Sequence, residues 1–151
     1  MTLPNALRVV RLSALYDLVV TAGFAFAFTA VPLFDALGAL HRTLDLAGVT
    51  PDPGDPFTLM FANLMGSVVT VWALFRIFRP SLEAGAADVG ARVLFSLGMV
   101  VALLAGASPL VLVMLVLEVA WALVQAAALL TARSSRATGR RSAAPLVAAK
   151  P

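Results

Sequence analysis

Four long runs of apolar residues, separated by shorter polar stretches, are the main pattern of this 151-residue chain. Each run approaches the roughly 20 residues that a helix needs to cross a bilayer. Only helices and closed barrels satisfy their backbone in lipid, and runs this long and continuous indicate helices. We therefore expect four transmembrane helices, at about 12–33, 57–78, 89–106 and 110–132.

The segments between these runs predict a long outer loop, a tight hairpin and a basic tail. Apolar residues recur at helical spacing between Phe34 and Leu46, which predicts a short helix lying on the membrane surface. The proline-rich segment 50–56 then turns the chain back, and the turn 106–109 joins the last two helices closely. The tail, 133–151, has no apolar period, and we expect it to be disordered or to lie against anionic headgroups.

The composition also indicates a membrane protein. Hydrophobic residues make up 61% of the chain and the mean hydropathy is +0.96, whereas soluble domains contain about 45–50% apolar residues. The predicted fold class is an all-α integral membrane protein, a four-helix transmembrane bundle with a short outer interfacial helix, formed by residues 1–132. The N-terminus superficially resembles a signal peptide, but its apolar stretch is too long and carries Asp17, so we expect it to be retained.

The basic residues predict the orientation of the bundle. If the N-terminus is cytoplasmic, ten of the 11 Lys and Arg residues fall on that side and only Arg42 falls on the other. The positive-inside rule then predicts a multi-pass protein of the inner (cytoplasmic) membrane with both termini in the cytoplasm. Because these residues are not interleaved with stacking aromatics, we do not expect nucleic-acid binding.

Each predicted helix has one face that is more polar than lipid favours, which predicts a polar pocket inside the bundle. An alternative interpretation is that these polar groups only form hydrogen bonds between helices. The residues that we expect to contact a ligand in this pocket are Thr21, Ser67, Thr70, Met114, Trp121 and Gln125. In contrast, Trp72 lies near a helix end and is predicted to belong to an interfacial aromatic belt.

Glu118 is the strongest candidate functional residue, because it interrupts an apolar run in which a carboxylate costs roughly 3 kcal/mol. The helical rise places Asn63 at a similar depth on another helix, so we expect the two side chains to be neighbours. Asp17 is expected in a separate layer nearer the cytoplasm, paired with Arg76 or Arg92. Arg92 is predicted to extend toward the headgroups.

That second layer, which also contains Asp88, is predicted to consist of structural ion pairs in which the arginines offset the carboxylates. The chain contains no cysteine and a single histidine, His41, so thiol chemistry is excluded and no metal or other cofactor is expected. A histidine on a surface helix is usually only solvated, and a role for His41 in a lid over the bundle is the alternative.

We expect the pocket to bind a hydrophobic small molecule from the surrounding membrane lipid. If the protein is an enzyme, the candidate catalytic residues are Glu118, Asn63 and Asp17, and isomerisation or cyclisation by proton transfer fits best. Two alternatives remain open. The chain is either a proton-coupled transporter or channel subunit that works as a homo-oligomer, or an accessory subunit of a larger membrane complex.

Overall fold

The structure is a computed structural model that describes residues 2–142, and within this range it contains helices and no strand. The helices are α1 (Leu3–Thr21), the short 3-10 helix η1 (Ala22–Phe24), α2 (Ala27–Thr43), α3 (Pro56–Phe78), α4 (Leu82–Leu104) and α5 (Leu110–Ser142). The all-α class is therefore confirmed. In the described range α3, α4 and α5 are each long and apolar enough to cross a membrane, whereas α1 and α2 meet this criterion only together, as a bent pair.

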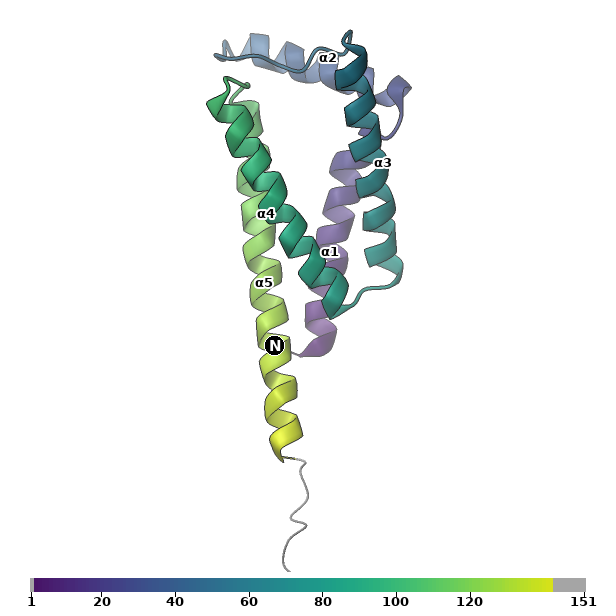
Figure 1. The fold of residues 1–151 in the computed structure, drawn as a ribbon, viewed down its shortest axis with the longest axis vertical. Helices are drawn as coiled ribbons and strands as arrows, with labels where there is room; N and C mark the ends of the chain where they lie inside the picture. Colours follow the sequence, from purple (N-terminus) through teal and green to yellow (C-terminus); the bar gives the residue numbers. More distant parts are fainter. Residues whose placement is uncertain (1, 143–151) are drawn as a thin grey trace, which may run out of the picture.

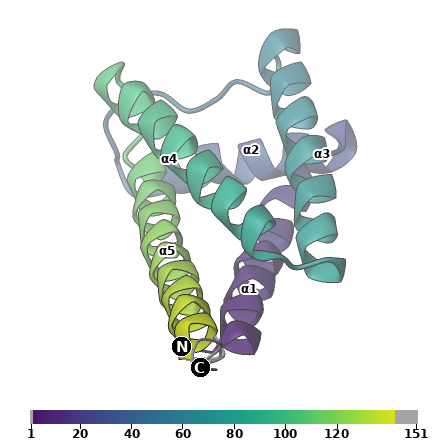
Figure 2. The same cartoon turned by 60° about the horizontal axis from the view of Figure 1, so that its bottom comes forward.

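The long helices α1, α3, α4 and α5 run side by side, and α2 lies across one end of them (Figure 1). α1 packs against α3 and α5, and α4 packs against α5. α3 and α4 follow each other in the sequence, but within the described chain they diverge from their connecting turn and do not pack along their length (Figure 2). α1 therefore links the α3 side of the bundle to the α4–α5 side.

The predicted first span, 12–33, is not one continuous helix. α1 begins earlier, at Leu3, and ends at Thr21, and the chain then bends by 97° before α2. The backbone of Phe26 is extended, with φ −131° and ψ 140°, which ends helical hydrogen bonding there. The helix predicted between Phe34 and Leu46 is present up to Thr43, as the second half of α2, which begins at Ala27.

Helix α3 approaches the bend closely and packs against its backbone. A Cβ atom at Gly66 would lie 2.5 Å from the carbonyl carbon of Phe24, so only glycine fits this contact. The next residue, Ser67, donates a hydrogen bond of 3.4 Å to the backbone oxygen of Ala25. The bend is therefore held by contacts with α3 from a distant part of the sequence.

The other helix boundaries differ from the prediction mainly at α4 and α5. Helix α4 starts at Leu82 rather than at 89, because the hydroxyl of Ser81 accepts a hydrogen bond from the backbone of Ala84 at 3.0 Å and caps the helix. Helix α5 continues beyond 132 to Ser142. The remainder of the predicted tail, 143–151, lies outside the described residues.

A side-chain cap fixes the start of α3. The carboxylate of Asp55 accepts hydrogen bonds from the backbone of Phe57 at 3.3 Å and of Thr58 at 2.9 Å, and from the Thr58 hydroxyl at 2.6 Å. The Thr58 hydroxyl is the main reason that the pKa of Asp55 is lower than usual. Pro56 follows as the first residue of the helix, where no backbone donor is needed.

The outer loop is tied to the turn between α4 and α5. The backbone of Val49 donates to the oxygen of Gly106 at 3.0 Å and accepts from the nitrogen of Ser108 at 2.8 Å. His41, in α2, forms a hydrogen bond of 2.8 Å between its Nδ1 and the hydroxyl of Ser108. These contacts join α2 to the rest of the molecule at that end.

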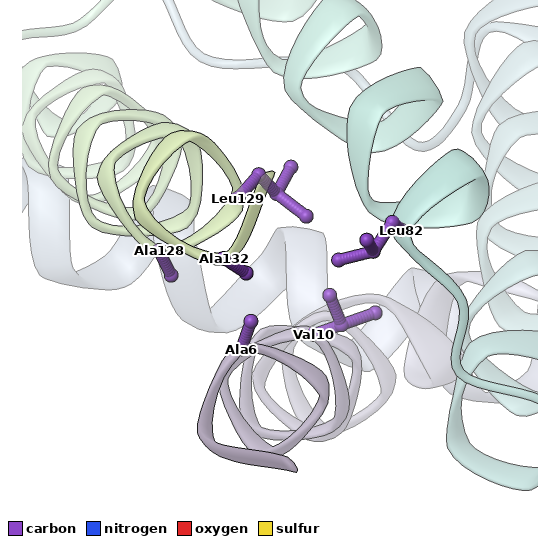
Figure 3. Packing of buried hydrophobic residues seen from close by; sticks show 6 residues of the cluster. All are labelled: Ala6, Val10, Leu82, Ala128, Leu129 and Ala132. Carbon is purple, nitrogen blue, oxygen red and sulfur yellow. The ribbon is translucent and has the colours of Figure 1, made fainter. Parts of the chain in front are cut away.

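A small apolar core holds the opposite end of the bundle together. Figure 3 shows its members, which come from α1, α4 and α5: Ala6, Val10, Leu82, Ala128, Leu129 and Ala132. Most of the other large apolar side chains on α3, α4 and α5 point outward, and only 11% of each apolar window in these helices is buried. A soluble monomer rarely exposes apolar surface on this scale, so the helices indicate a membrane protein.

Candidate functional site

Within the described chain, five charged side chains from four helices meet inside the bundle. They are Asp17 of α1, Arg76 of α3, Asp88 and Arg92 of α4, and Glu118 of α5. Each is at most 7% exposed. Buried charges are costly unless they are paired and hydrogen-bonded, and these five side chains pair with one another. We call them the charge cluster.

Arg92 lies at the centre of the charge cluster and contacts all three carboxylates. Its Nη1 is 2.6 Å from Oε2 of Glu118, and its Nη2 is 2.8 Å from both carboxylate oxygens of Asp17. Its Nε is 3.1 Å from Oδ2 of Asp88, one helical turn away on α4. All three nitrogens of this guanidinium are therefore engaged by carboxylates.

Arg76 provides the second positive charge and is completely buried. It forms an ion pair with Asp17 and a second one with Asp88, in which Nη1 lies 2.7 Å from Oδ2. Its guanidinium lies 5.6 Å from the ring centre of Trp72, within the range of a cation–π contact. The indole nitrogen of Trp72 donates a hydrogen bond of 3.1 Å to Asp88, so this tryptophan belongs to the polar network.

Gln125 and Ser13 extend the network between α5 and α1. The side-chain nitrogen of Gln125 donates to Oδ2 of Asp88 at 3.1 Å and to the backbone oxygen of Gly85 at 2.7 Å. Its side-chain oxygen accepts from the hydroxyl of Ser13 at 2.5 Å. Because Gln125 is fully buried and bonded to other helices, it stabilises the packing of α5 rather than facing a ligand.

A cavity of about 430 Å³ lies beside the charge cluster, between α3 and α4. Four members of the cluster, Asp17, Asp88, Arg92 and Glu118, line it. The remaining wall consists mostly of aromatic, methionine and small apolar side chains, among them Phe24, Phe34, Trp72, Phe95, Met99 and Met114. Beyond the contacts of Asp88 with Trp72 and Arg76, α3 and α4 diverge in the described chain, so the cavity faces the side of the bundle.

Glu118 lines this cavity and is only partly paired. Its Oε2 binds Arg92, while its Oε1 has no hydrogen-bond or ion-pair partner among the described side chains. The residue as a whole is 7% exposed. Glu118 therefore brings to the cavity wall a carboxylate of which one oxygen has no partner among the described side chains.

Several sequence predictions agree with this arrangement. Asp17 was expected to pair with Arg76 or Arg92 and pairs with both, and Asp88 belongs to the same ion-pair group. Thr21 and Met114 line the cavity, and the hydroxyl of Thr21 donates to the backbone of Asp17.

The predicted division into two polar layers is wrong, because Arg92 binds Glu118 and Asp17 at the same time. Arg92 also does not extend toward the headgroups. It is 1% exposed and, because α4 starts early, lies about three turns into the helix.

Asn63 is not the neighbour of Glu118 that its depth predicted. It lines a separate hollow beside α3 together with Ser67, and its buried Oδ1 has no hydrogen-bond partner in the described part of the chain. Two residues at the same depth can lie on helix faces that point in different directions. The face of α3 that carries Asn63 does not point toward α5. The hydroxyl of Thr70 is likewise buried without a partner among the described residues.

Neither tryptophan lies where the sequence predicted it. Trp121 packs on the ring of Tyr16, with 5.8 Å between centroids, and is not among the cavity-lining residues. Trp72 was predicted to belong to an interfacial belt but lines the cavity and binds Asp88. Its position one helical turn before Arg76 was the sequence signal for this role, since residues four apart share a helix face.

In residues 2–142 no group of three or more histidine or acidic side chains is placed to hold a metal ion. Comparison of the chain with protein-family models, curated proteins and solved structures finds no match. The function must therefore be argued from the site itself.

Proposed function

We propose that this is an integral membrane protein that binds a hydrophobic small molecule in the cavity between α3 and α4. The observation that carries the proposal is an apolar cavity of about 430 Å³ that ends at a buried charge cluster. Ligand pockets in proteins typically have volumes of about 300–1,000 Å³ and combine apolar walls with a few polar groups. This cavity has both properties.

The lateral position of the cavity fits a ligand that enters from lipid. The helices on either side of it, α3 and α4, are long enough to cross a bilayer and carry apolar residues on their outer faces. A hydrophobic molecule dissolved in the bilayer would reach the cavity between them without passing through water. Its apolar body would lie against side chains such as Phe95 and Met99, and its polar end would meet Glu118.

The basic residues support an orientation with both termini in the cytoplasm. Arg76 and Arg92 are buried in the charge cluster and do not contribute to the charge bias at the membrane surface. Eight basic residues then remain on the side of the termini, and Arg42 is on the other side. The bias still follows the positive-inside rule, which favours the inner membrane of a cell as the location.

A binding experiment with a matched pair of variants tests the proposal. The wild-type protein in phosphatidylcholine nanodiscs is titrated with tritiated decanol, and bound radioactivity is measured by scintillation proximity. Ala91→Phe places a large side chain in the cavity wall, whereas Ala120→Phe makes the same change at an exposed position of α5 that does not line the cavity.

We expect saturable decanol binding to the wild type and to Ala120→Phe, and at least about a tenfold loss of affinity in Ala91→Phe, because the inserted ring occupies the ligand volume. Binding that is not saturable in the wild type, or that is equal in the three proteins, would show that the cavity does not hold the ligand.

A further inference from the structure

The charge cluster contains more negative than positive groups. It consists of three carboxylates, from Asp17, Asp88 and Glu118, and two guanidinium groups, from Arg76 and Arg92. With every group ionised, the described cluster carries a formal charge of −1. An uncompensated charge in an apolar interior is strongly unfavourable, so the ionised cluster requires one further positive charge, from a bound cation or from a proton on a carboxylate.

The imbalance is greater on the surface that faces the cavity. All three carboxylate residues line the cavity, but Arg92 is the only basic residue of the described chain that does so, and Arg76 is not among the lining residues. The nitrogens of Arg92 are already engaged by Glu118, Asp17 and Asp88. An anionic ligand would therefore find no free positive group on this surface, whereas a cation would find the unpaired Oε1 of Glu118.

The apolar wall is also suited to a positive charge. The rings of Phe24, Phe34, Trp72 and Phe95 line the same cavity as Glu118. The faces of aromatic rings attract ammonium groups, and cages of several rings recognise quaternary amines. The same rings accommodate the hydrophobic part of an amphiphile.

We propose that the ligand is a hydrophobic cation, with a protonated amine or a quaternary ammonium group bound beside Oε1 of Glu118. This inference rests on the proposed function and adds the chemical class of the ligand. In the complex the ammonium group brings the cluster to a net charge of zero, and the apolar body fills the cavity toward Phe34 and Met99.

The test uses three compounds with the same chain and different head groups. Unlabelled decyltrimethylammonium, decanol and decanoate compete with tritiated decanol for the wild-type protein in phosphatidylcholine nanodiscs. For each protein the inhibition constant of decanol is divided by that of decyltrimethylammonium. The ratio in the wild type is then compared with the ratios in Glu118→Gln and Glu118→Asp. Asp35→Asn, which removes an exposed carboxylate from α2, is the control. Partition of each compound into the nanodisc is common to all four proteins, so a change in the ratio reports on the site.

In the wild type we expect decyltrimethylammonium to bind about tenfold or more tightly than decanol, and decanoate to bind most weakly, because one unit charge acts at close range in an apolar site. Glu118→Gln should reduce the ratio of the two affinities about tenfold. Glu118→Asp should keep it closer to the wild-type value, and Asp35→Asn should leave it unchanged.

Two results would overturn this inference while leaving the proposed function in place. In the first, decanol binds the wild type saturably and as tightly as the ammonium compound, which is the behaviour of a site whose extra negative charge is balanced by a proton on Glu118. In the second, the preference for the cation persists in Glu118→Gln. If no compound of the series binds saturably, the proposed function itself fails, and this inference fails with it.

Discussion

Arg92 is the residue on which the charge cluster depends most, because it contacts carboxylates from three helices. Asp17 belongs to α1, Asp88 to α4 and Glu118 to α5, and all three lie within 3.1 Å of its guanidinium. Arg76 contacts only two of them. The loss of Arg92 would leave Glu118 without any ion-pair partner among the described residues.

Arg92→Leu should destabilise the protein by about 3–5 kcal/mol, because breaking a buried ion pair leaves uncompensated carboxylates in the interior. The measurement is the midpoint of thermal unfolding in detergent, followed by circular dichroism. Arg79→Leu is the matched control, since Arg79 is exposed at the end of α3 and should change stability by no more than about 0.5 kcal/mol. Similar losses in the two variants would show that the cluster does not stabilise the fold.

Part of the site can be predicted from single residues and part cannot. The pairing of Asp17 with arginines follows from depth alone, since the apolar helices offer few other partners. The partner of Glu118 does not follow, because it depends on where α4 begins. Residues 82–88 contain Glu83 and Asp88 and do not look like part of an apolar span, yet they are helical and place Arg92 deep inside the bundle.

The bend between α1 and α2 is the element that shapes the cavity at its outer end. Phe24 precedes the bend and Phe34 follows it, and both line the cavity. Their rings contact each other, with 5.3 Å between centroids. A straight helix through this segment would carry the two rings along the bundle axis and away from each other.

Gly66→Ala should destabilise the protein by about 1–3 kcal/mol, because the added methyl group meets the backbone of the bend, which cannot rotate away as a side chain can. Thermal unfolding in detergent measures the effect. Gly98→Ala, in α4, is the matched control because no atom beyond its chain neighbours and the nearby backbone of α4 lies within 4 Å of the Cβ position there. It should be neutral or slightly stabilising, since alanine is the better helix former. Equal unfolding midpoints for the two variants would mean that α3 does not hold the bend.

The bend was not predictable from the apolar pattern, whereas the existence of α3, α4 and α5 was. The hydrophobicity of a segment indicates whether it avoids water. The segments before and after the bend are both apolar, so their hydrophobicity does not reveal a bend between them. The contact that stabilises the bend comes from Gly66 and Ser67, about forty residues away in the sequence. Glycine in an apolar helix signals a close approach but does not identify its partner.

At the scale of the whole molecule, the positions of the basic residues predict which end of the bundle faces the cytoplasm. The chain has no cysteine, so single cysteines can be introduced as reporters without other changes. We expect Thr43→Cys, at the end of α2, to react with a membrane-impermeant maleimide in spheroplasts of a bacterial expression host. Asn5→Cys, at the start of α1, should react only after the membrane is permeabilised. Labelling of both cysteines before permeabilisation, or of Asn5→Cys alone, would contradict the orientation.

The cavity also depends on the whole molecule, because its wall contains residues of α1, η1, α2, α3, α4 and α5. The described helices pack at the end formed by α1, α4 and α5 and are joined by hydrogen bonds at the end covered by α2. Between these ends α3 and α4 diverge beyond the contacts of Asp88 with Trp72 and Arg76. This arrangement gives a hydrophobic molecule a lateral route to the buried charges.

The most direct test is to locate a ligand in an experimental structure. Crystals of the wild-type protein grown in a lipid phase with ω-bromodecanol would reveal the bromine by anomalous scattering. We predict a bromine site in the cavity between α3 and α4, with the hydroxyl group beside Glu118, and the loss of that site in Ala91→Phe. Bromine found only on the outer, lipid-facing surfaces of the helices, with the cavity empty of ligand, would contradict the account.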